Sequence, residues 1–230
     1  MAITVLNPES PGTGEAANAP ARLSDAEISD WAGVPVSVAV DLAPEGQIDP
    51  AIALRTRLPA GEEAGLSLRG RALTVRCDPP DFGAVVLALD HVQVGDVVVI
   101  AAQARTDFAM IGEILGGHLR SKGCAGLVVD GAVRDIDQLG SWSDFPVFAR
   151  AVNPLGPTSA AGGVLNGPIE AGGCNISPGD LILGDADGLI ALNPALARAH
   201  LAGARAKLEL EQRWISQLAA GQSAKDVFGL

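Results

Sequence analysis

The sequence has few aromatic residues, and this shortage argues against one broad class of architecture. Aromatic side chains make up only 3% of the 230 residues, whereas 48% of the residues are hydrophobic and 28 are glycine. Such a chain is long enough to bury a full core, as one large domain or two small ones. Aliphatic side chains packed around many tight turns are typical of an α/β or sheet-rich enzyme, so a helical bundle is not expected.

Basic residues are also scarce. Only 16 residues are Lys or Arg, they form no cluster, and the formal net charge is −11. Binding to a nucleic-acid backbone is therefore not expected. An acidic protein attracts divalent cations and repels anions, so an acidic substrate would need a local arginine.

Cysteines and long apolar runs are rare as well. Cys77, Cys124 and Cys174 are far apart and form no Cys-x-x-Cys pair, so we expect reduced core residues and a cytoplasmic protein. The chain begins without the basic start and apolar region of a signal peptide. No apolar run approaches the length of a bilayer span despite the mean hydropathy of +0.28, so no membrane partner is expected.

The order of patterns along the chain predicts an N-terminal arm, a core and a C-terminal helix. Residues 1–22 are predicted to be a flexible arm, because residues 7–20 carry almost nothing to bury. Residues 23–193 are predicted to form an α/β catalytic core, and 194–230 a long helix and tail. The elements expected in the core are a capped helix from Ser24 to Trp31, an edge strand or helix start over 34–41, strands over 69–77, 97–101, 127–129 and 145–150, a helix over 82–89, and a hairpin over 172–193 that turns at Asp187-Gly188.

A glycine-containing helix is predicted over residues 107–123. One set of apolar residues repeats there at helical spacing: Phe108, Ile111, Leu115 and Leu119. Gly112, Gly116 and Gly117 interrupt it, and each costs about 1 kcal/mol relative to alanine inside a helix. If the helix begins near Gly112, its first free amides form an anion site at a positive helix end. Alternatively, the glycines only permit close helix packing.

Two adjacent opposite charges follow the strand expected at 127–129. Asp130-Gly131 predicts a tight turn, and that bend would let Arg134 and Asp135 share one site, although neighbouring side chains on a straight strand point to opposite faces. The arginine suits a substrate carboxylate, and the aspartate suits a hard divalent metal. Alternatively, Asp135 caps a helix together with Gln138, and Arg134 is an ordinary surface cation.

Acidic residues also occupy the hairpin turn. Asp185 and Asp187 are potential metal ligands, but acids at such a turn more often only shape it.

Four segments of the sequence stand in a characteristic order: Gly112-Glu113-Ile114-Leu115, Gly123-x-x-Gly126-Leu-Val-Val-Asp130-Gly131-x-Val-Arg134-Asp135, Phe145-Pro146-Val147-Phe148-Ala149-Arg150, and Pro178-Gly179-Asp180 running into Gly184-Asp185-Ala-Asp187-Gly188. Together they resemble the family of 4-hydroxy-4-methyl-2-oxoglutarate aldolases and the related regulator of ribonuclease activity A proteins. The resemblance implies a swivelling β/β/α sandwich with a long C-terminal helix. It also implies a ring, a homotrimer or a multiple of it, with active sites between subunits.

The resemblance also implies roles for individual residues. Arg134 would bind the carboxylate of a pyruvyl group, and the backbone amides of 112–115 would hold the 2-oxo acid. Asp135 would bind Mg²⁺ or Mn²⁺ whose other ligands are largely waters. Glu113 would orient a metal-bound water, and Glu211 is the best match for a carboxylate from a neighbour's C-terminal helix.

The chemistry implied by the resemblance is a metal-dependent retro-aldol cleavage. The substrate would be a 4-hydroxy-2-oxo dicarboxylic or tricarboxylic acid such as 4-hydroxy-4-methyl-2-oxoglutarate. Pyruvate would be released, with oxaloacetate decarboxylation as a side activity. The four segments place no lysine for an imine, which favours the metal route. Residues 1–65 and 156–167 show no such resemblance, so the group at C4 of the substrate stays open.

The alternative function is a non-enzymatic regulator that binds a ribonuclease complex. Regulator-like members of the family are expected to lack the carboxylate at position 135, so the intact Arg134-Asp135 pair favours the enzyme.

Overall fold

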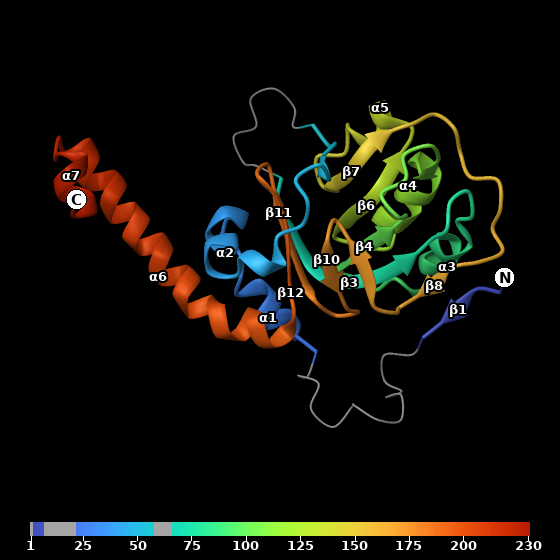
Figure 1. The fold of residues 1–230 in the computed structure, drawn as a ribbon, viewed down its shortest axis with the longest axis horizontal. Helices are drawn as coiled ribbons and strands as arrows, with labels where there is room; N and C mark the ends of the chain where they lie inside the picture. Colours follow the sequence, from blue (N-terminus) through green and yellow to red (C-terminus); the bar gives the residue numbers. More distant parts are fainter. Residues whose placement is uncertain (1, 7–21, 58–65) are drawn as a thin grey trace.

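A mixed β-sheet runs through the computed structural model, which describes residues 2–6, 22–57 and 66–230 (Figure 1). Its four central strands are parallel neighbours in the order β3-β4-β6-β7. They are β3 (Leu68–Arg76), β4 (Asp96–Ala101), β6 (Gly126–Val133) and β7 (Val147–Val152). Both faces of these strands are covered, which is why they are nearly continuous apolar runs in the sequence.

Shorter strands extend this sheet at its edges. The remaining strands are β1 (Thr4–Val5), β2 (Ala53–Leu54), β5 (Ala109–Ile111), β8 (Val164–Leu165), β11 (Leu181–Asp185) and β12 (Gly188–Leu192), and a separate two-stranded sheet contains β9 (Ile169–Ala171) and β10 (Cys174–Ile176). The helices are α1 (Asp25–Ser29), α2 (Val36–Leu42), the 3-10 turn η1 (Pro44–Gly46), α3 (Gly83–His91), α4 (Glu113–Ser121), α5 (Ile136–Leu139), α6 (Pro194–Ala219) and α7 (Ala224–Phe228). The predicted α/β class and long C-terminal helix are confirmed.

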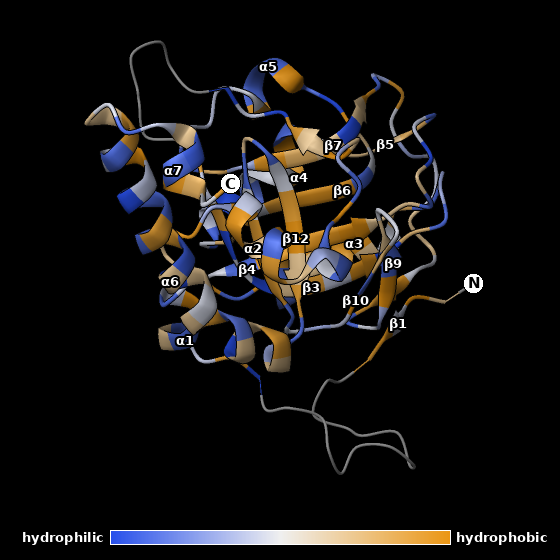
Figure 2. Cartoon of the chain, turned by 60° about the vertical axis from the view of Figure 1, so that its left-hand side comes forward, coloured by the Kyte–Doolittle hydropathy of each residue, from blue (hydrophilic) through white to orange (hydrophobic). Residues whose placement is uncertain are grey.

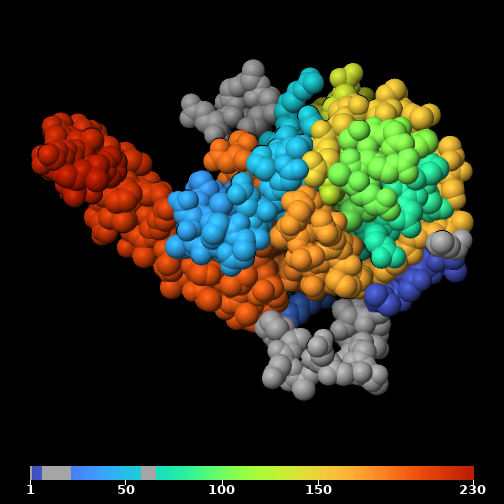
Figure 3. Space-filling view, in the orientation of Figure 1, coloured from blue at the N-terminus to red at the C-terminus, as the bar shows by residue number. Residues whose placement is uncertain are grey.

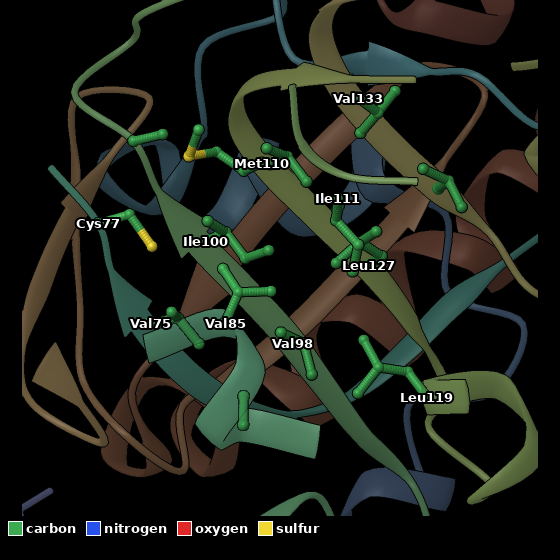
Figure 4. Close-up of a cluster of buried hydrophobic side chains, with 14 of the residues drawn as sticks. Val75, Cys77, Val85, Val98, Ile100, Met110, Ile111, Leu119, Leu127 and Val133 are labelled. Carbon is green, nitrogen blue, oxygen red and sulfur yellow. The ribbon is translucent and has the colours of Figure 1, made fainter. Parts of the chain in front are cut away.

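Alternate side chains of the central strands enter two different cores. Val98 and Ile100 pack under α3 and α4 in the cluster shown in Figure 4, whereas Val97 and Val99 face the small β9–β10 sheet. Burying one such side chain contributes about 1.5 to 3 kcal/mol, so the strands are stabilised from both sides. Figure 2 shows the resulting distribution, with hydrophobic strands inside and a mixture of polar and hydrophobic residues along α6.

The predicted turn at Asp130-Gly131 is wrong, because β6 continues through both residues to Val133. The Asp130 carboxylate is buried, where it accepts hydrogen bonds from Arg150 Nε and from the Gly172 amide, the latter at 2.8 Å. A Cβ on Gly131 would lie 2.9 Å from the Cβ of Ala102, so this glycine permits close packing instead of a turn. The register with β7 shifts at this point, which is an irregularity of the β-bulge type.

The helix expected over 107–123 begins later than its apolar spacing suggested. Ala109–Ile111 is strand β5, paired with β6, and α4 begins at Glu113 with Gly112 as its N-cap. Phe108 and Ile111 therefore match the helical spacing by coincidence. Of the two alternatives for residues 34–41, the structure has the helix, which starts after Pro35.

Several local predictions are confirmed. Ser24 and Glu27 form a capping box at the start of α1, and β11 and β12 form a hairpin at the expected turn. The hairpin begins only at Leu181, because Cys174–Ile176 is strand β10 and pairs with β9 in the separate small sheet. Asp185 at its turn accepts hydrogen bonds from the amides of Val36 and Asp187, as a turn and capping residue does. The three cysteines are free and buried, and burial raises the pKa of Cys77 to about 12 and that of Cys124 to about 11.

The two ends of the described chain differ in how they meet the core. Residues 4–5 of the predicted arm pair with β8, whereas residues 7–20 lie outside the described residues. The N-terminal part of α6 packs on α2, and its C-terminal part projects away from the body with α7 (Figures 1 and 3). Among the described helices, none combines the length and apolarity that crossing a bilayer requires.

Ion pairs join α6 to the helices near the N-terminus. Arg198 pairs with Glu27 at 2.6 Å and Arg205 with Asp30 at 2.8 Å, and Lys207 pairs with Asp41. The Arg198 side chain, together with the backbone and hydroxyl of Ser24, lowers the pKa of Glu27 from 4.5 to about 2.

This depressed pKa predicts a pH-dependent contribution to stability. A carboxylate with a lowered pKa in the folded state stabilises the fold above its ordinary pKa, and the contribution disappears as the pH falls from 4.5 toward about 2. Glu27→Gln should therefore flatten the free energy of unfolding over that window when it is measured by denaturant titration at each pH. Glu45→Gln, at an exposed residue without an ion pair in the described chain, should keep the wild-type profile. Identical profiles for all three proteins would contradict the assignment.

Candidate active site

Arg134 and Asp135 lie at the junction where β6 ends and α5 begins. Asp135 adopts the left-handed conformation, with φ 56° and ψ 42°. Few residues other than glycine adopt it, and aspartate does so more readily than most. The chain turns there, and Arg134 Nε lies 3.7 Å from Asp135 Oδ2. The predicted bend thus exists, at Asp135 itself and not at Asp130-Gly131.

The Asp135 carboxylate joins this junction to the start of α4. Its Oδ2 accepts a hydrogen bond of 3.0 Å from the Glu113 amide, at the positive end of that helix. It makes no side-chain hydrogen bond to its own helix α5, so the alternative of a capping box with Gln138 is wrong. No hydrogen bond reaches Oδ1 within the described chain, so this oxygen is available to a cation or a water.

Gly112 allows the two elements to approach. Its φ of −147° suits any residue, so backbone conformation does not require a glycine here. A Cβ at this position would collide with Asp135 Oδ2 and lie 2.7 Å from Arg134 Cγ. The backbone at Gly112 is therefore closely approached, as expected, and the atoms that approach it belong to Asp135 and Arg134. Gly116 matches the alternative prediction, that a glycine permits close packing of the helix, since a Cβ there would lie 3.2 Å from Leu139 Cδ2.

The first amides of α4 are only partly free to bind an anion, and the predicted anion site there stays a prediction. The Glu113 amide is used by Asp135, and the Gly116 amide donates to the Gly112 carbonyl. The amides of Ile114 and Leu115 donate no hydrogen bond to any described residue. They lie at a helix N-terminus, where free N–H groups and the helix dipole favour an anion.

A recess of about 280 Å³ opens beside these groups. Its polar lining comes from Arg134 and Asp135, and the remaining lining residues are Phe82, Ala109, Met110, Ile111, Gly112, Ile114, Leu115 and Pro157. A second hollow of about 580 Å³ adjoins the same pair and is lined by Arg134, Asp135, Ile136, Val152 and Pro154. The charged pair therefore lies between two open spaces with mainly apolar walls.

The guanidinium of Arg134 is half-exposed and available. Its nitrogen atoms make no hydrogen bond within the described residues, and the 3.7 Å contact with Asp135 is its single ion pair there. A Cβ on Gly156 would collide with its Nη1 and lie 3.3 Å from its Cζ, so backbone packs directly on the guanidinium. This contact could not be predicted from the sequence, because Gly156 lies in a Pro- and Gly-rich crossover that is separate from Arg134 along the chain.

The donor set fits a metal that keeps most of its waters. The described residues contain no group of three or more His, Cys, Asp or Glu side chains arranged around one point. Asp135, with Glu113 exposed at the start of α4, can provide one or two carboxylates. Mg²⁺ is commonly bound in that way, through few carboxylates and several waters.

Glu211, the remaining residue expected at the site, is distant within a single chain. It lies on α6, where its Oε1 is 4.0 Å from Lys207 Nζ. Figure 1 shows strands between α6 and α4, and the two helices contribute to different hydrophobic clusters. A role for Glu211 therefore requires a neighbouring subunit and stays a prediction.

Comparisons with known sequences identify a family and several relatives. A model of the RraA-like family, described as Aldolase/RraA, matches residues 24–191, which include every residue lining the two hollows. A protein of Halalkalibacterium halodurans named "Putative 4-hydroxy-4-methyl-2-oxoglutarate aldolase" is 41% identical over 120 residues, 52% of this chain. The chain thus spans only 57% of that relative's length. A protein of Burkholderia mallei with the same name is 35% identical over 50% of this chain and 70% of its own length.

Solved structures share the fold. The RNA-processing inhibitor RraA from Thermus thermophilus is 27% identical, with a TM-score of 0.61 over 69% of this chain and 92% of its own. A protein from Pseudomonas syringae pv. tomato has a TM-score of 0.75 over 90% of this chain and 94% of its own, and its 24% identity supports the fold alone.

The contact at Gly112 predicts a position-specific effect of alanine. Gly112→Ala should displace the Asp135 carboxylate from the Glu113 amide and lower the free energy of unfolding by about 1 to 3 kcal/mol. Gly117→Ala is the matched control in the same helix, because its Cβ would meet nothing closer than 3.8 Å. That variant should gain stability, by up to about 1 kcal/mol from helix propensity. Denaturant unfolding curves that show equal stability for both variants would contradict the packing argument.

Proposed function

This chain belongs to the RraA-like family of Aldolase/RraA proteins, and we propose that it is a divalent-metal-dependent aldolase, a carbon-carbon lyase that releases pyruvate. The proposed substrates are 4-hydroxy-2-oxo dicarboxylic or tricarboxylic acids such as 4-hydroxy-4-methyl-2-oxoglutarate, the compound in the names of two relatives. The observation that carries the proposal is the position of Arg134 and Asp135 in one recess beside the free amides of α4.

Arg134 and the α4 amides would bind the anionic end of the substrate. Two parallel N–H groups of a guanidinium match the two oxygens of a carboxylate. The amides of Ile114 and Leu115 can accommodate a further oxygen that carries negative charge. With a net charge of −11, the protein needs such a local concentration of positive charge to bind an acid.

Asp135 would hold Mg²⁺ or Mn²⁺, and Glu113 would orient a water bound to it. The free Oδ1 of Asp135 and the exposure of both carboxylates support this assignment. A bound divalent ion supplies Lewis-acid polarisation of the 2-oxo group.

The reaction requires loss of the C4 hydroxyl proton, cleavage of the C3–C4 bond and protonation of C3. Glu113 would orient the water that takes the hydroxyl proton. As the bond breaks, Arg134 and the amides of α4 would stabilise the negative charge that moves onto the pyruvyl oxygens. Water then protonates C3 and pyruvate leaves. Loss of CO₂ from oxaloacetate generates the same charge, which is why we include oxaloacetate decarboxylation as a side activity.

The position of Lys122 supports the metal route over an imine. Lys122 follows the last residue of α4, at the end opposite the recess, and its Nζ donates to the Leu89 carbonyl at 2.8 Å. A lysine held in this way cannot reach a substrate carbonyl beside Arg134.

We also propose a homotrimer or a multiple of it, in which a neighbour's α6 brings Glu211 to the site. The part of the chain that supports this proposal is the projecting end of α6 together with α7. It carries a set of exposed apolar side chains, Ile215, Leu218, Phe228 and Leu230. Such residues on a projecting helix are typical of a surface that packs against another chain.

The competing function is regulation of a ribonuclease complex by surface contact, which the similarity to the Thermus inhibitor suggests. That function requires neither a guanidinium free of hydrogen bonds nor a carboxylate oriented beside it. The arrangement of Arg134, Asp135 and the α4 amides therefore favours catalysis.

The first test of the proposed function is pyruvate release. Wild-type protein should release pyruvate from 4-hydroxy-4-methyl-2-oxoglutarate with Mg²⁺ or Mn²⁺ and lose this activity in EDTA. Asp135→Asn should lower kcat/KM by at least about a hundredfold, because it removes the metal-binding charge. Asp137→Asn, two residues away and exposed, should behave as wild type. Absence of release with every metal would refute the aldolase assignment.

The role of Glu211 predicts complementation between two inactive proteins. Asp135→Asn and Glu211→Gln subunits should each be nearly inactive alone, whereas co-expressed chains should regain activity. Random assortment gives about a quarter of the sites an intact Asp135 from one chain and an intact Glu211 from another. Glu209→Gln, on the same helix, is the control and should be active alone. A mixture that stays as inactive as its parents would exclude a shared site.

A further inference from the structure

One segment crosses the candidate site from Asn153 to Gly163 and is held at its first end by the sheet. The Asn153 amide donates to the Val133 carbonyl at 2.9 Å, one residue before Arg134. The Asn153 side chain donates to the Thr106 carbonyl at 2.8 Å, and the Ala109 amide donates to the Leu155 carbonyl at 2.7 Å. Residues 153–155 are therefore fixed to the strand ends that carry the site.

The other end of the segment is held by backbone hydrogen bonds to residues 80–84, such as that from the Thr158 amide to the Pro80 carbonyl at 3.0 Å, and by the side-chain carboxylate of Asp81. Its Oδ2 accepts from Ser159 Oγ and from the Ala161 amide at 2.9 Å. Its Oδ1 accepts from the Gly162 amide at 3.0 Å and from the Gly83 amide at 2.9 Å, at the start of α3. Four donors thus meet at one side chain, and three of them belong to residues 159–162.

The charge of Asp81 suits this arrangement. Burial raises the pKa of its carboxyl, but the hydrogen bonds from Ser159, Gly83, Ala161 and Gly162 outweigh that effect and leave the pKa below its ordinary value. The side chain is therefore ionised at neutral pH, and each of its oxygens can accept two hydrogen bonds.

Between the two ends, the segment lies on Arg134. Gly156 packs against the guanidinium so closely that a Cβ would collide with Nη1. Pro157 lines the recess, as does Phe82, the residue that follows Asp81. The position of residues 156–157 therefore determines where the guanidinium lies and how much of the recess is open.

We propose that Asp81 is a positioning residue, which holds Gly156 and Pro157 against Arg134 through residues 159–162 and thereby fixes the point at which a substrate carboxylate binds. The inference rests on the proposed function for its consequence in catalysis. Asp81 itself touches neither the recess nor the reacting atoms. Its effect is to hold the Arg134 side chain in position, because even a small misplacement of a binding group lowers the catalytic efficiency of an enzyme.

Two variants weaken the hydrogen bonds between Asp81 and residues 159–162 to different extents. Asp81→Asn keeps the size of the side chain but replaces one oxygen by an amide nitrogen, which cannot accept from a backbone N–H. Ser159→Ala removes one of the four donors and leaves the charge in place. Asp90→Asn, at an exposed aspartate of α3, is the matched control for loss of one negative charge.

The first measurement reports the position of the arginine and needs no turnover. Arg134 is labelled with phenylglyoxal, and its modification rate is followed by peptide mass spectrometry. Asp81→Asn should be labelled several-fold faster than wild type because the backbone at Gly156 no longer covers the guanidinium. Asp90→Asn should be labelled at the wild-type rate. Unchanged labelling in Asp81→Asn would overturn the inference, whatever its kinetics.

The second measurement is pyruvate release well below the melting temperature of each variant. Asp81→Asn should raise KM about tenfold and change kcat by less than about threefold, with Ser159→Ala intermediate. A merely structural role would lower Tm and leave KM unchanged, so faster labelling with an unchanged KM would also overturn the inference. If wild-type protein releases no pyruvate, the proposed function fails, while the labelling rates still decide whether Asp81 positions Arg134.

Discussion

The contact between Gly112 and the Arg134-Asp135 pair is the constraint on which the candidate site depends. It lets the start of α4 lie directly against the end of β6, so one carboxylate oxygen reaches both an amide of the helix and a neighbouring guanidinium. Parallel strands deliver these elements to the same edge of the sheet, where α/β proteins commonly bind ligands. A side chain at position 112 would separate the positive end of α4 from Arg134 and Asp135, and these two residues would no longer line the recess beside the helix.

The same strand carries a second charged group, which faces the interior. Asp130, four residues before Arg134, is buried against Arg150, and Arg150 also pairs with Asp49 at 2.7 Å. Buried ion pairs add little net stability because desolvation opposes their attraction, but they require one defined geometry. This network joins β6 and β7 to the loop before β2 and to the small sheet, and it coincides with the register shift below the site. One face of β6 thus organises the interior, and the residues that follow the strand form the site.

The sequence predicted those parts of the molecule that short-range patterns determine. Apolar runs located the central strands, Asp187-Gly188 located the hairpin, and adjacent charges after an apolar strand located Arg134 and Asp135. It could not predict features that depend on partners distant in the chain. Asp130-Gly131 resembles a turn until Arg150 is placed beside it, and the importance of Asp81 depends on Ser159, 78 residues later. Glu211 remains a prediction, because its proposed partner would belong to another subunit.

The ion pairs of α6 have a consequence for the order of events during synthesis. They join positions 166 to 175 residues apart, and the hydrophobic cluster between them includes Leu23, Trp31 and Ala204. A ribosome makes the chain from its N-terminus, so α1 and α2 emerge long before the helix that covers them. Until then the central strands can assemble, but Leu23 and Trp31 lack part of their cover. Helix α6, which is made after the central strands, therefore completes the burial of the first helices, and a chain stopped before α6 would expose them to the chaperones of the cell.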